Sequence, residues 1–322
     1  MLLPKVAGHY LDTLRAAIRA AEKFRGSTTP NPPVGAAVLD EAGTVLAIGV
    51  HERPGEAHAE VAALSQLREL GAMARAHTLV VTLEPCNHTG KTSPCTEAIV
   101  KAGIRQVLFG CRDPNPNVAG GGAAFLKAKG LSVTAGVLEN ECHELARGFF
   151  SLIERGRPFV TLKIARDEKG SMIPPPGQKT FTSQESLTLA HEMRRASDAI
   201  VTGSGTVLGD DPEFTVRHVH DFEHKTRIVA VLDRRGRVPD AWFEKGALLR
   251  QERIRWTESP ERLLAFLAKR QVQEVLIEAG PSVVDVFRDV GLVDEEVVFE
   301  KGPGSGSGGD RLQRRRFPSP RS

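Results

Sequence analysis

Four residues between positions 58 and 95 have the types and the spacing for metal-assisted chemistry. His58, Cys86 and Cys95 can each offer a metal ligand, and Glu60 follows the histidine by two positions. One imidazole and two thiolates suit Zn²⁺, which prefers nitrogen and sulfur ligands in a tetrahedron. Three protein ligands leave the fourth position for water, as in catalytic zinc sites, and Glu60 can move a proton between that water and a leaving group.

The pattern H-x-E followed by P-C is typical of zinc-dependent deaminases of bases, although eight residues rather than two separate the cysteines here. Two alternatives remain open at this point. The ligands could be ordinary buried residues, or a closed structural zinc site with His51 or His88 as fourth ligand. Glu60 by itself could be a solvated carboxylate that favours a helix N-terminus. Because deamination requires a carboxylate at this position, the pattern favours a catalytic site that hydrolyses an amine.

Alternating helices and short strands must position these residues, and the alternation predicts an α/β fold with helices covering a sheet. In the first half the apolar spacing predicts helices at 10–24, 58–70, 93–102, 123–129 and 139–150, and strands at 36–39, 45–50, 79–83, 106–110 and 131–135. In the second half it predicts strands at 159–165, 198–202, 227–232, 274–277 and 296–300, and helices at 183–195, 260–269 and 282–289. His58 then falls in the first turn of a helix. Both cysteines fall near helix starts, where N–H groups lower thiolate pKa values.

Length and composition predict two domains. The 322 residues suffice for both, with a boundary near Glu154 to Pro158. We expect domains at 1–150 and 157–301, then a Gly/Ser/Arg-rich tail at 302–322 that forms a loop or stays disordered. The sequence has no apolar run of membrane-spanning length, and its first ten residues lack the apolar region of a signal peptide. We therefore expect a cytoplasmic protein that does not enter a membrane.

The charges are nearly balanced, with 43 Lys plus Arg against 40 Asp plus Glu and a net charge of +3. Such a balance gives no indication of a nucleic-acid partner. Cys86 and Cys95 belong to the metal pattern, so a disulfide framework is disfavoured and a reducing compartment is expected. Cys111 and Cys142 are expected to be small buried hydrophobic residues.

Four motifs follow one another in the first half: P-N-P-P-V-G at 30–35, H-x6-H-A-E at 51–60, T-L-E-P-C-N-H-T-G-K-T-S-P-C at 82–95, and D-P-N-P-N-V-A-G-G-G at 113–122. Their order resembles the bifunctional deaminase/reductase family of riboflavin biosynthesis. The spacer H-x-G-K-T between the cysteines distinguishes that family from nucleoside and tRNA deaminases. The resemblance implies a three-layer, cytidine-deaminase-like domain that deaminates a diaminopyrimidinone ribosylamine 5′-phosphate.

The resemblance also implies roles for residues around the zinc. Asn31 would hold the pyrimidine ring, and Lys91 would meet the substrate phosphate as a point charge. The other implied substrate-binding residues are His51, His88, Asp113 and Asn115. Taken alone, Lys91 would be read as a surface lysine, and Asn31 or Asn115 as a turn former beside proline.

The second half is similar to the reductase domain of the same family, which has a dihydrofolate-reductase-like fold and uses NADPH. The matching segments lie at 160–165, 182–183, 193–194, 197–217, 231–239 and 278–282. The implied substrate and cofactor residues are Lys163, Thr182, Ser183, Arg194, Gly203, Gly205, Thr206, Asp211, Arg217, Asp233, Arg237, Glu278 and Gly280.

Several of these residues suit a particular role. The turn G-S-G-T at 203–206 would let the backbone approach the cofactor, and Arg237 suits a cofactor phosphate. Asp211 would bind sugar hydroxyls, Arg217 would bind the substrate phosphate, and Glu278 would lie near the nicotinamide. The simpler alternatives are a tight turn at G-S-G-T and a helix or turn cap around Asp211. Ser183 is also expected to cap the helix that follows it.

The second half departs from the family pattern at several positions. Lys169 stands where the family has an acidic residue, Thr180 replaces a tryptophan, Leu187 replaces an arginine, and the family continues beyond the Gly/Ser-rich tail. Three hypotheses follow. The first is a bifunctional enzyme that associates into homo-oligomers; the second is a deaminase with a weakened or inactive reductase-like domain. The third, a zinc deaminase of nucleic acid, is disfavoured by the spacer, the balanced charge and the scarcity of Tyr and Trp for base stacking.

Overall fold

The computed structural model describes residues 6–87, 93–115, 121–172, 182–301 and 310–317. The chain divides into two compact units, residues 1–155 and 156–322. This break falls within the boundary segment expected at 154–158, and the first unit keeps a last helix that extends past residue 150. Among the described residues, no helix combines the length and the apolar character needed to cross a membrane.

The first unit contains a five-stranded mixed sheet in the order β2-β1-β3-β4-β5. Its strands are β1 (Gly35–Leu39), β2 (Val45–Val50), β3 (Thr78–Leu83), β4 (Gln106–Cys111) and β5 (Ser132–Thr134). β1 pairs antiparallel with β2 and β3, whereas β3, β4 and β5 run parallel. The carboxyl ends of β3 and β4 therefore lie at the same edge of the sheet.

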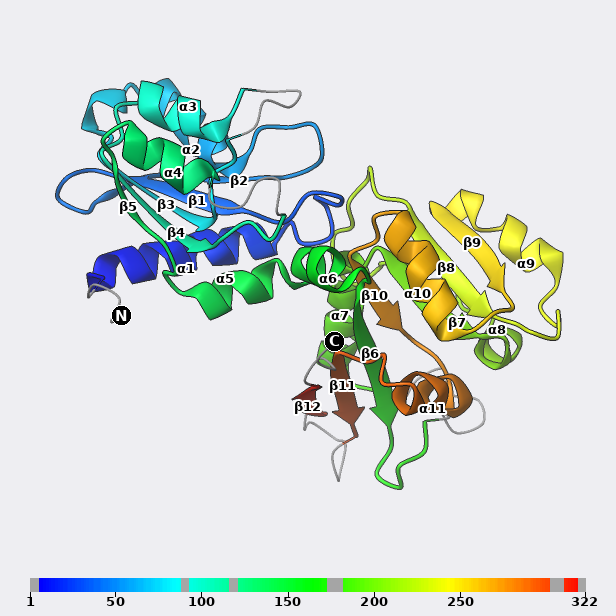
Figure 1. The fold of residues 1–322 in the computed structure, drawn as a ribbon. Helices are drawn as coiled ribbons and strands as arrows, with labels where there is room; N and C mark the ends of the chain where they lie inside the picture. The colour runs from blue at the N-terminus through cyan, green and yellow to red at the C-terminus, as the bar shows by residue number, and fades with distance from the viewer. Residues whose placement is uncertain (1–5, 88–92, 116–120, 173–181, 302–309, 318–322) are drawn as a thin grey trace. The chain divides into compact units, whose positions relative to one another are not determined.

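Helices cover both faces of this sheet (Figure 1). The helices are α1 (Gly8–Glu22), α2 (Ala59–Glu69), α3 (Cys95–Lys101), α4 (Gly121–Ala128), α5 (Glu139–Leu145) and α6 (Arg147–Arg155). Along β1, Ala36 and Val38 pack with residues of α2, α3 and α4, while Ala37 and Leu39 pack with α1, α5 and α6. Successive side chains of a strand point to opposite faces of the sheet, so the buried strand β1 contributes to a hydrophobic core on each face. The unit therefore has three layers, with the sheet between two layers of helices.

The second unit contains a seven-stranded sheet in the order β12-β11-β6-β10-β7-β8-β9. Its strands are β6 (Phe159–Arg166), β7 (Ala199–Gly203), β8 (Arg227–Leu232), β9 (Gln251–Trp256), β10 (Glu274–Ile277), β11 (Glu295–Glu300) and β12 (Arg311–Arg316). Its helices are α7 (Gln184–Ala196), α8 (Ser204–Asp210), α9 (Asp240–Glu244), α10 (Pro260–Lys269) and α11 (Pro281–Asp289). Every pairing is parallel except that of β12 with β11.

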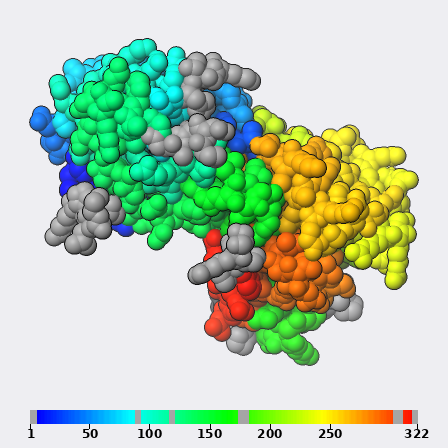
Figure 2. Space-filling view, in the orientation of Figure 1, coloured from blue at the N-terminus to red at the C-terminus, as the bar shows by residue number. Residues whose placement is uncertain are grey.

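The expectation that residues 302–322 contain only loop or disorder is wrong for β12. This strand pairs antiparallel with β11 along its whole length. Arg314 and Arg316 both approach the buried Glu295, at 3.7 and 3.2 Å, so the strand is held by charge as well as by backbone pairing. Most of its residues are exposed, and in Figure 2 its red atoms lie at the surface. An edge strand made of arginines has no apolar alternation, which is why the sequence pattern did not reveal it.

Candidate active site

The three candidate zinc ligands come from three different elements of the first unit. Cys86 follows β3 by three residues, Cys95 is the first residue of α3, and His58 precedes α2 as its N-cap. The prediction that His58 lies within the first helical turn is wrong, because its backbone is extended (φ −67°, ψ 157°). An N-cap residue has non-helical dihedral angles, so the angular spacing of an ideal helix does not relate His58 to Glu60.

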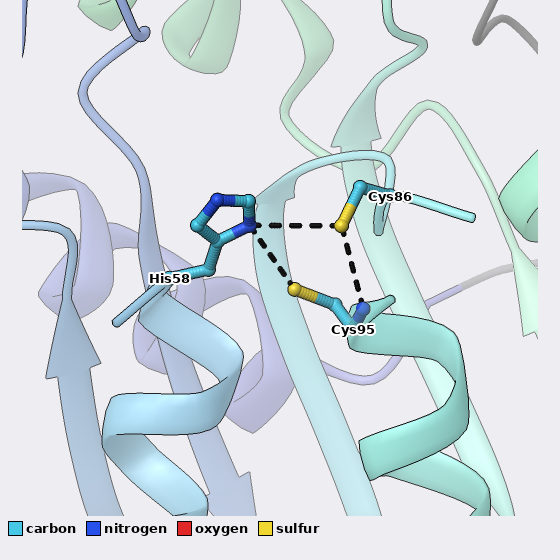
Figure 3. A group of neighbouring side chains, drawn as sticks. All are labelled: His58, Cys86 and Cys95. Carbon is cyan, nitrogen blue, oxygen red and sulfur yellow. Dashed lines mark hydrogen bonds between the residues drawn. The ribbon is translucent and has the colours of Figure 1, made fainter. Parts of the chain in front are cut away.

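The ligand atoms converge on one point (Figure 3). The Nδ1 atom of His58 lies 3.2 Å from Sγ of Cys95 and 3.6 Å from Sγ of Cys86. All three ligand atoms lie within 4.8 Å of one another. A tetrahedral zinc with standard bond lengths places nitrogen and sulfur ligands roughly 3.6 Å apart. The donor set and its spacing therefore fit Zn²⁺, with His58 binding through Nδ1.

The electrostatics of the site favour a bound cation. Hydrogen bonds from the side chain of Cys95 and from His58 lower the pKa of the Cys86 thiol to about 4, and the backbone N–H of Cys95 also donates to its sulfur at 3.3 Å. The hydrogen bond shared with Cys86, together with burial, raises the pKa of Cys95. The hydrogen bond with Cys86 raises the pKa of His58. These groups compete for protons at one point, and a metal ion there stabilises thiolates and releases the protons.

Glu60 lies in the first turn of α2 and is only 4% exposed. Burial raises the pKa of its carboxyl group to about 7, and its side chain also hydrogen-bonds to Cys95. A buried carboxylate beside a ligand sulfur is not the solvated first-turn residue of the simpler alternative. Its position and its altered proton affinity suit a group that takes up and releases a proton.

Two residues that were not among the predicted site residues tie the loop of Cys86 to α4. Glu84 is buried, and its Oε1 accepts the backbone N–H of Ala123 at 2.9 Å in the first turn of α4. Gly122 packs so closely that a Cβ atom there would lie 2.0 Å from the carbonyl oxygen of Pro85. The G-G-G stretch after D-P-N-P-N-V-A was the available signal, because a glycine is needed where two backbones meet.

We predict that Gly122→Ala weakens the zinc site. The added methyl group meets a backbone oxygen, so either α4 or the loop that carries Cys86 must move. Overpacking of this kind costs about 1–3 kcal/mol, and we expect a lower unfolding free energy and a smaller zinc content after dialysis. The matched control is Gly121→Ala, where the nearest atom to a Cβ would be 4.0 Å away. Equal zinc retention in both variants would contradict the close-packing explanation.

Asn31 and His51 meet beside the zinc ligands. The Nδ2 group of Asn31 lies 3.0 Å from Nε2 of His51, and Nδ1 of His51 lies 3.0 Å from the carbonyl oxygen of Ala57. The pattern fits a neutral imidazole that donates from Nδ1 to Ala57 and accepts from Asn31, and burial lowers the pKa of His51. The His51 and His58 rings are 5.5 Å apart. His51 is therefore committed to these partners and not to a closed zinc site.

The remaining deaminase residues follow β4 or lie outside the described residues. Asp113 Oδ1 accepts the backbone N–H of Asn115 at 2.9 Å, which forms a turn just after the carboxyl end of β4. β3, which leads to Cys86, ends at the same sheet edge. His88 and Lys91 fall in 88–92, outside the described residues.

In the second unit, three of the predicted residues form a buried charge cluster. Glu278 follows β10 and accepts two hydrogen bonds from Arg194 of α7, at 2.5 and 2.8 Å. Lys163 of β6 lies 3.5 Å from the same carboxylate. Burial alone would raise the pKa of Glu278, but the charges of Arg194 and Lys163 lower it to about 2. Glu278 directly follows the carboxyl end of the parallel strand β10, at the edge where open α/β sheets bind ligands.

A second group of predicted residues surrounds the start of α8. The G-S-G-T stretch is not a tight turn: Gly203 ends β7 and serves as N-cap of α8, while Gly205 and Thr206 lie in its first turn. Thr206 Oγ1 accepts the backbone N–H of Gly280 at 3.2 Å. Arg237 donates to the Ser204 hydroxyl at 2.7 Å. Thus Gly280, two residues after Glu278, joins this group to the charge cluster.

Four other predicted residues lie outside these two groups: Thr182, Ser183, Asp211 and Asp233. The side chain of Asp233 is 0% exposed, and it accepts the N–H groups of Arg237 and Val238, so it shapes the turn between β8 and α9. Its assignment to the cofactor site stays a prediction, and the contacts that the structure shows for its carboxylate are those of the turn. Asp211 is exposed and lies 3.7 Å from Lys245. The Oγ of Ser183 accepts the N–H of Ser186 and caps α7, as expected, with Thr182 just before it.

Comparison with known proteins places the chain in a family. The zinc-binding region of cytidine and deoxycytidylate deaminases matches residues 9–111, and the RibD C-terminal domain matches residues 158–301. The riboflavin biosynthesis protein RibD of Aquifex aeolicus is 36% identical over 308 residues, with 89% of this chain and 85% of that protein covered. This chain belongs to the RibD family. RibD of Escherichia coli is 33% identical over 319 residues, with 88% and 85% covered.

A solved structure of a RibD relative has the same two-domain fold. The deaminase/reductase from Thermotoga maritima superimposes with a TM-score of 0.81 at 35% identity, covering 94% of this chain and 89% of that one. RibD membership confirms the predicted fold class, the deaminase and reductase activities in riboflavin biosynthesis, and the cofactors Zn²⁺ and NADPH. The two alternatives, a deaminase with an inactive second domain and a deaminase of nucleic acid, receive no support from these matches.

Proposed function

We propose that the first unit deaminates a diaminopyrimidinone ribosylamine 5′-phosphate, and that His58, Cys86 and Cys95 hold the zinc that this reaction needs. The convergence of the three ligand atoms beside the buried Glu60 carries the proposal. When bound, zinc lowers the pKa of a water molecule and makes it a nucleophile at neutral pH. Glu60 takes a proton from the attacking water and transfers it to the amino group that leaves as ammonia.

The residues beside the zinc ligands orient the pyrimidine. The amide of Asn31 is fixed because its Nδ2 group donates to His51, which in turn donates to a backbone carbonyl. Held in this way, Asn31 offers its Oδ1 atom as an acceptor for an N–H group of the ring. Asp113 and Asn115 border the same sheet edge, and Lys91 and His88 complete the substrate contacts from the spacer between the cysteines.

In the second unit the deaminated product is reduced by hydride transfer from NADPH, which converts its ribose to a ribityl chain. NADPH supplies the hydride when bound. The first turn of α8, with Gly203, Gly205 and Thr206, and the neighbouring Arg237 bind its phosphates. Lys163, Arg194 and Glu278 face the sugar of the substrate, and Glu278 keeps its negative charge because both cations adjoin it.

Arg217 lies on the segment that follows α8, and it binds the phosphate of the substrate in this second reaction. Its side chain is 55% exposed and pairs with Glu213 at 2.8 Å, an exposed contact that an incoming phosphate can replace. Asp211, on the same segment, meets the sugar hydroxyls. We further propose that the enzyme works in the cytoplasm as a homo-oligomer and without nucleic acid.

One set of assays on the purified chain tests this function. We expect about one zinc per chain, release of ammonia from the diaminopyrimidinone substrate, and NADPH oxidation when the deaminated product is supplied. Prior removal of zinc with a chelator should abolish ammonia release and leave NADPH oxidation with added product intact. Deamination without any NADPH oxidation would instead support the hypothesis of an inactive reductase domain.

The charge cluster makes the stability of the second unit depend on pH. The folded-state pKa of Glu278 is lowered from 4.5 to about 2, so its contribution is complete above pH 4.5 and is lost as the pH falls toward 2. The expected loss is about 1.4 kcal/mol for each pH unit below 4.5, or about 3 kcal/mol in total. Urea unfolding of the wild type and of Glu278→Gln at pH 6 and at pH 3.5 measures this loss. The wild type should exceed the variant in unfolding free energy by about 1.4 kcal/mol less at pH 3.5 than at pH 6. A difference that stays constant with pH would show that the carboxylate is not stabilised by its partners.

A further inference from the structure

One face of α7 holds the segment of residues 211–218 that follows α8. Arg194 donates from Nη1 to the carbonyl oxygen of Thr215 at 3.2 Å. His191, one helical turn earlier, accepts the backbone N–H of Arg217 at Nδ1, at 3.0 Å. Gln184 lies two further turns back, and its Nε2 is 3.1 Å from Nδ1 of His218. Residues at these spacings share one side of a helix, so three side chains of α7 contact the segment in succession.

The other side of the segment is held as well. The carbonyl oxygen of Glu213 accepts hydrogen bonds from Gln251 at 2.7 Å and from Arg253 at 3.2 Å, both on β9. Phe214 has a positive φ of 54° and is buried in the core formed with Val207 and Trp242. Residues 213–215 are therefore held by α7 on one side and by β9 on the other. The hydrogen bond from the N–H of Arg217 to His191 is the next contact along the chain.

The environment of His191 keeps its ring in place and keeps Nδ1 able to accept a hydrogen bond. It is 3% exposed, and its ring meets the ring of His218 edge to face at 4.5 Å. Burial lowers the pKa of His191 to about 4, assisted by the neighbouring Arg194, His218 and Arg217 and opposed by Glu278. The imidazole is thus neutral at neutral pH, and its Nδ1 lone pair remains available to the N–H of Arg217.

We propose that His191 is a positioning residue of the reductase site, which fixes the backbone of Arg217 so that its guanidinium meets the substrate phosphate. The inference rests on the proposed function of Arg217. An acceptor is needed at this point because Arg217 lies outside any helix or strand, where no ladder partner is provided for its N–H group. With its backbone fixed, the exposed side chain of Arg217 has fewer arrangements to lose when it binds an anion.

The substitutions that test this role differ in where they place an acceptor. The Oδ1 atom of asparagine lies near the position of the histidine Nδ1, whereas the acceptor of glutamine lies farther along the side chain. We expect His191→Asn to stay within about threefold of the wild type. For His191→Gln the KM of the deaminated, phosphorylated substrate should rise about 10- to 100-fold, as expected for a misplaced binding group. The kcat and the KM of NADPH should change little in either variant.

A double-mutant cycle decides whether His191 acts through Arg217. We expect Arg217→Ala to raise the same KM, and the addition of His191→Gln to raise it no further. His220→Gln, at an exposed histidine beyond the segment, is the matched control, and ammonia release by the first unit reports on the integrity of each preparation. Additive effects of the two substitutions, or equal KM values for the Asn and Gln variants, would overturn the proposal. Absence of NADPH oxidation by the wild type would instead overturn the proposed reductase function.

Discussion

Replacement of Glu60 by glutamine is expected to lower kcat for deamination by at least about 1,000-fold while the zinc stays bound. Glu60 is buried at the start of α2, and its carboxyl group lies beside the Cys95 sulfur. Glutamine keeps the size and polarity of the side chain but cannot take a proton from water or give one to the leaving amine. Proton transfer by a positioned group contributes about 10²- to 10⁴-fold, and here the same group serves twice in one turnover.

Two measurements separate this prediction from general damage to the site. Zinc content determined by metal analysis should equal that of the wild type, because glutamine leaves His58, Cys86 and Cys95 unchanged. Glu56→Gln is a matched control, since Glu56 is an exposed residue in the same stretch that pairs with Arg53. Substantial turnover by Glu60→Gln, with zinc retained, would show that another group moves the proton.

Replacement of Cys86 by serine is expected to remove zinc and deamination together. Cys86 supplies one of three converging ligand atoms, and its thiolate is already favoured by hydrogen bonds from Cys95 and His58. A serine hydroxyl is a poor substitute because zinc binds deprotonated sulfur far better than a neutral oxygen. We expect zinc affinity to fall by more than about 100-fold, since loss of an outer-shell partner alone costs about 10- to 100-fold.

The control for this substitution is Cys142→Ser. Cys142, on α5, is buried in the core between that helix and the sheet, and it takes no part in the ligand cluster. Burial raises the pKa of its thiol well above the ordinary value. Its variant should keep zinc, as measured by competition with a chromogenic chelator. NADPH oxidation with added product should persist in Cys86→Ser because the reductase unit has its own sheet and core. Normal zinc content in Cys86→Ser would contradict the ligand assignment.

Sequence patterns predict some residues of a functional site better than others. The zinc residues could be predicted because their chemistry restricts them to a few residue types at characteristic spacings. Asn31 and His51 were predicted as separate substrate contacts, and the structure adds that one fixes the other through a 3.0 Å hydrogen bond. For Asp233 the structure adds a role in a turn, since its carboxylate accepts two backbone N–H groups there, and a motif aspartate can serve a turn as readily as a ligand.

The sequence alone was sufficient for the family, the α/β class, and most helices and strands, and it was sufficient to propose His58, Cys86, Cys95 and Glu60 as a zinc site, because apolar periodicity and ligand chemistry are local properties. Only the tertiary structure decided which side chains from distant segments act together. It joined Lys163, Arg194 and Glu278 into one charge cluster, and it placed Gly122 against the loop of Cys86. It also paired the arginine-rich β12 with β11. These contacts join residues far apart in the chain, and their energies depend on burial and distance, which no local pattern specifies.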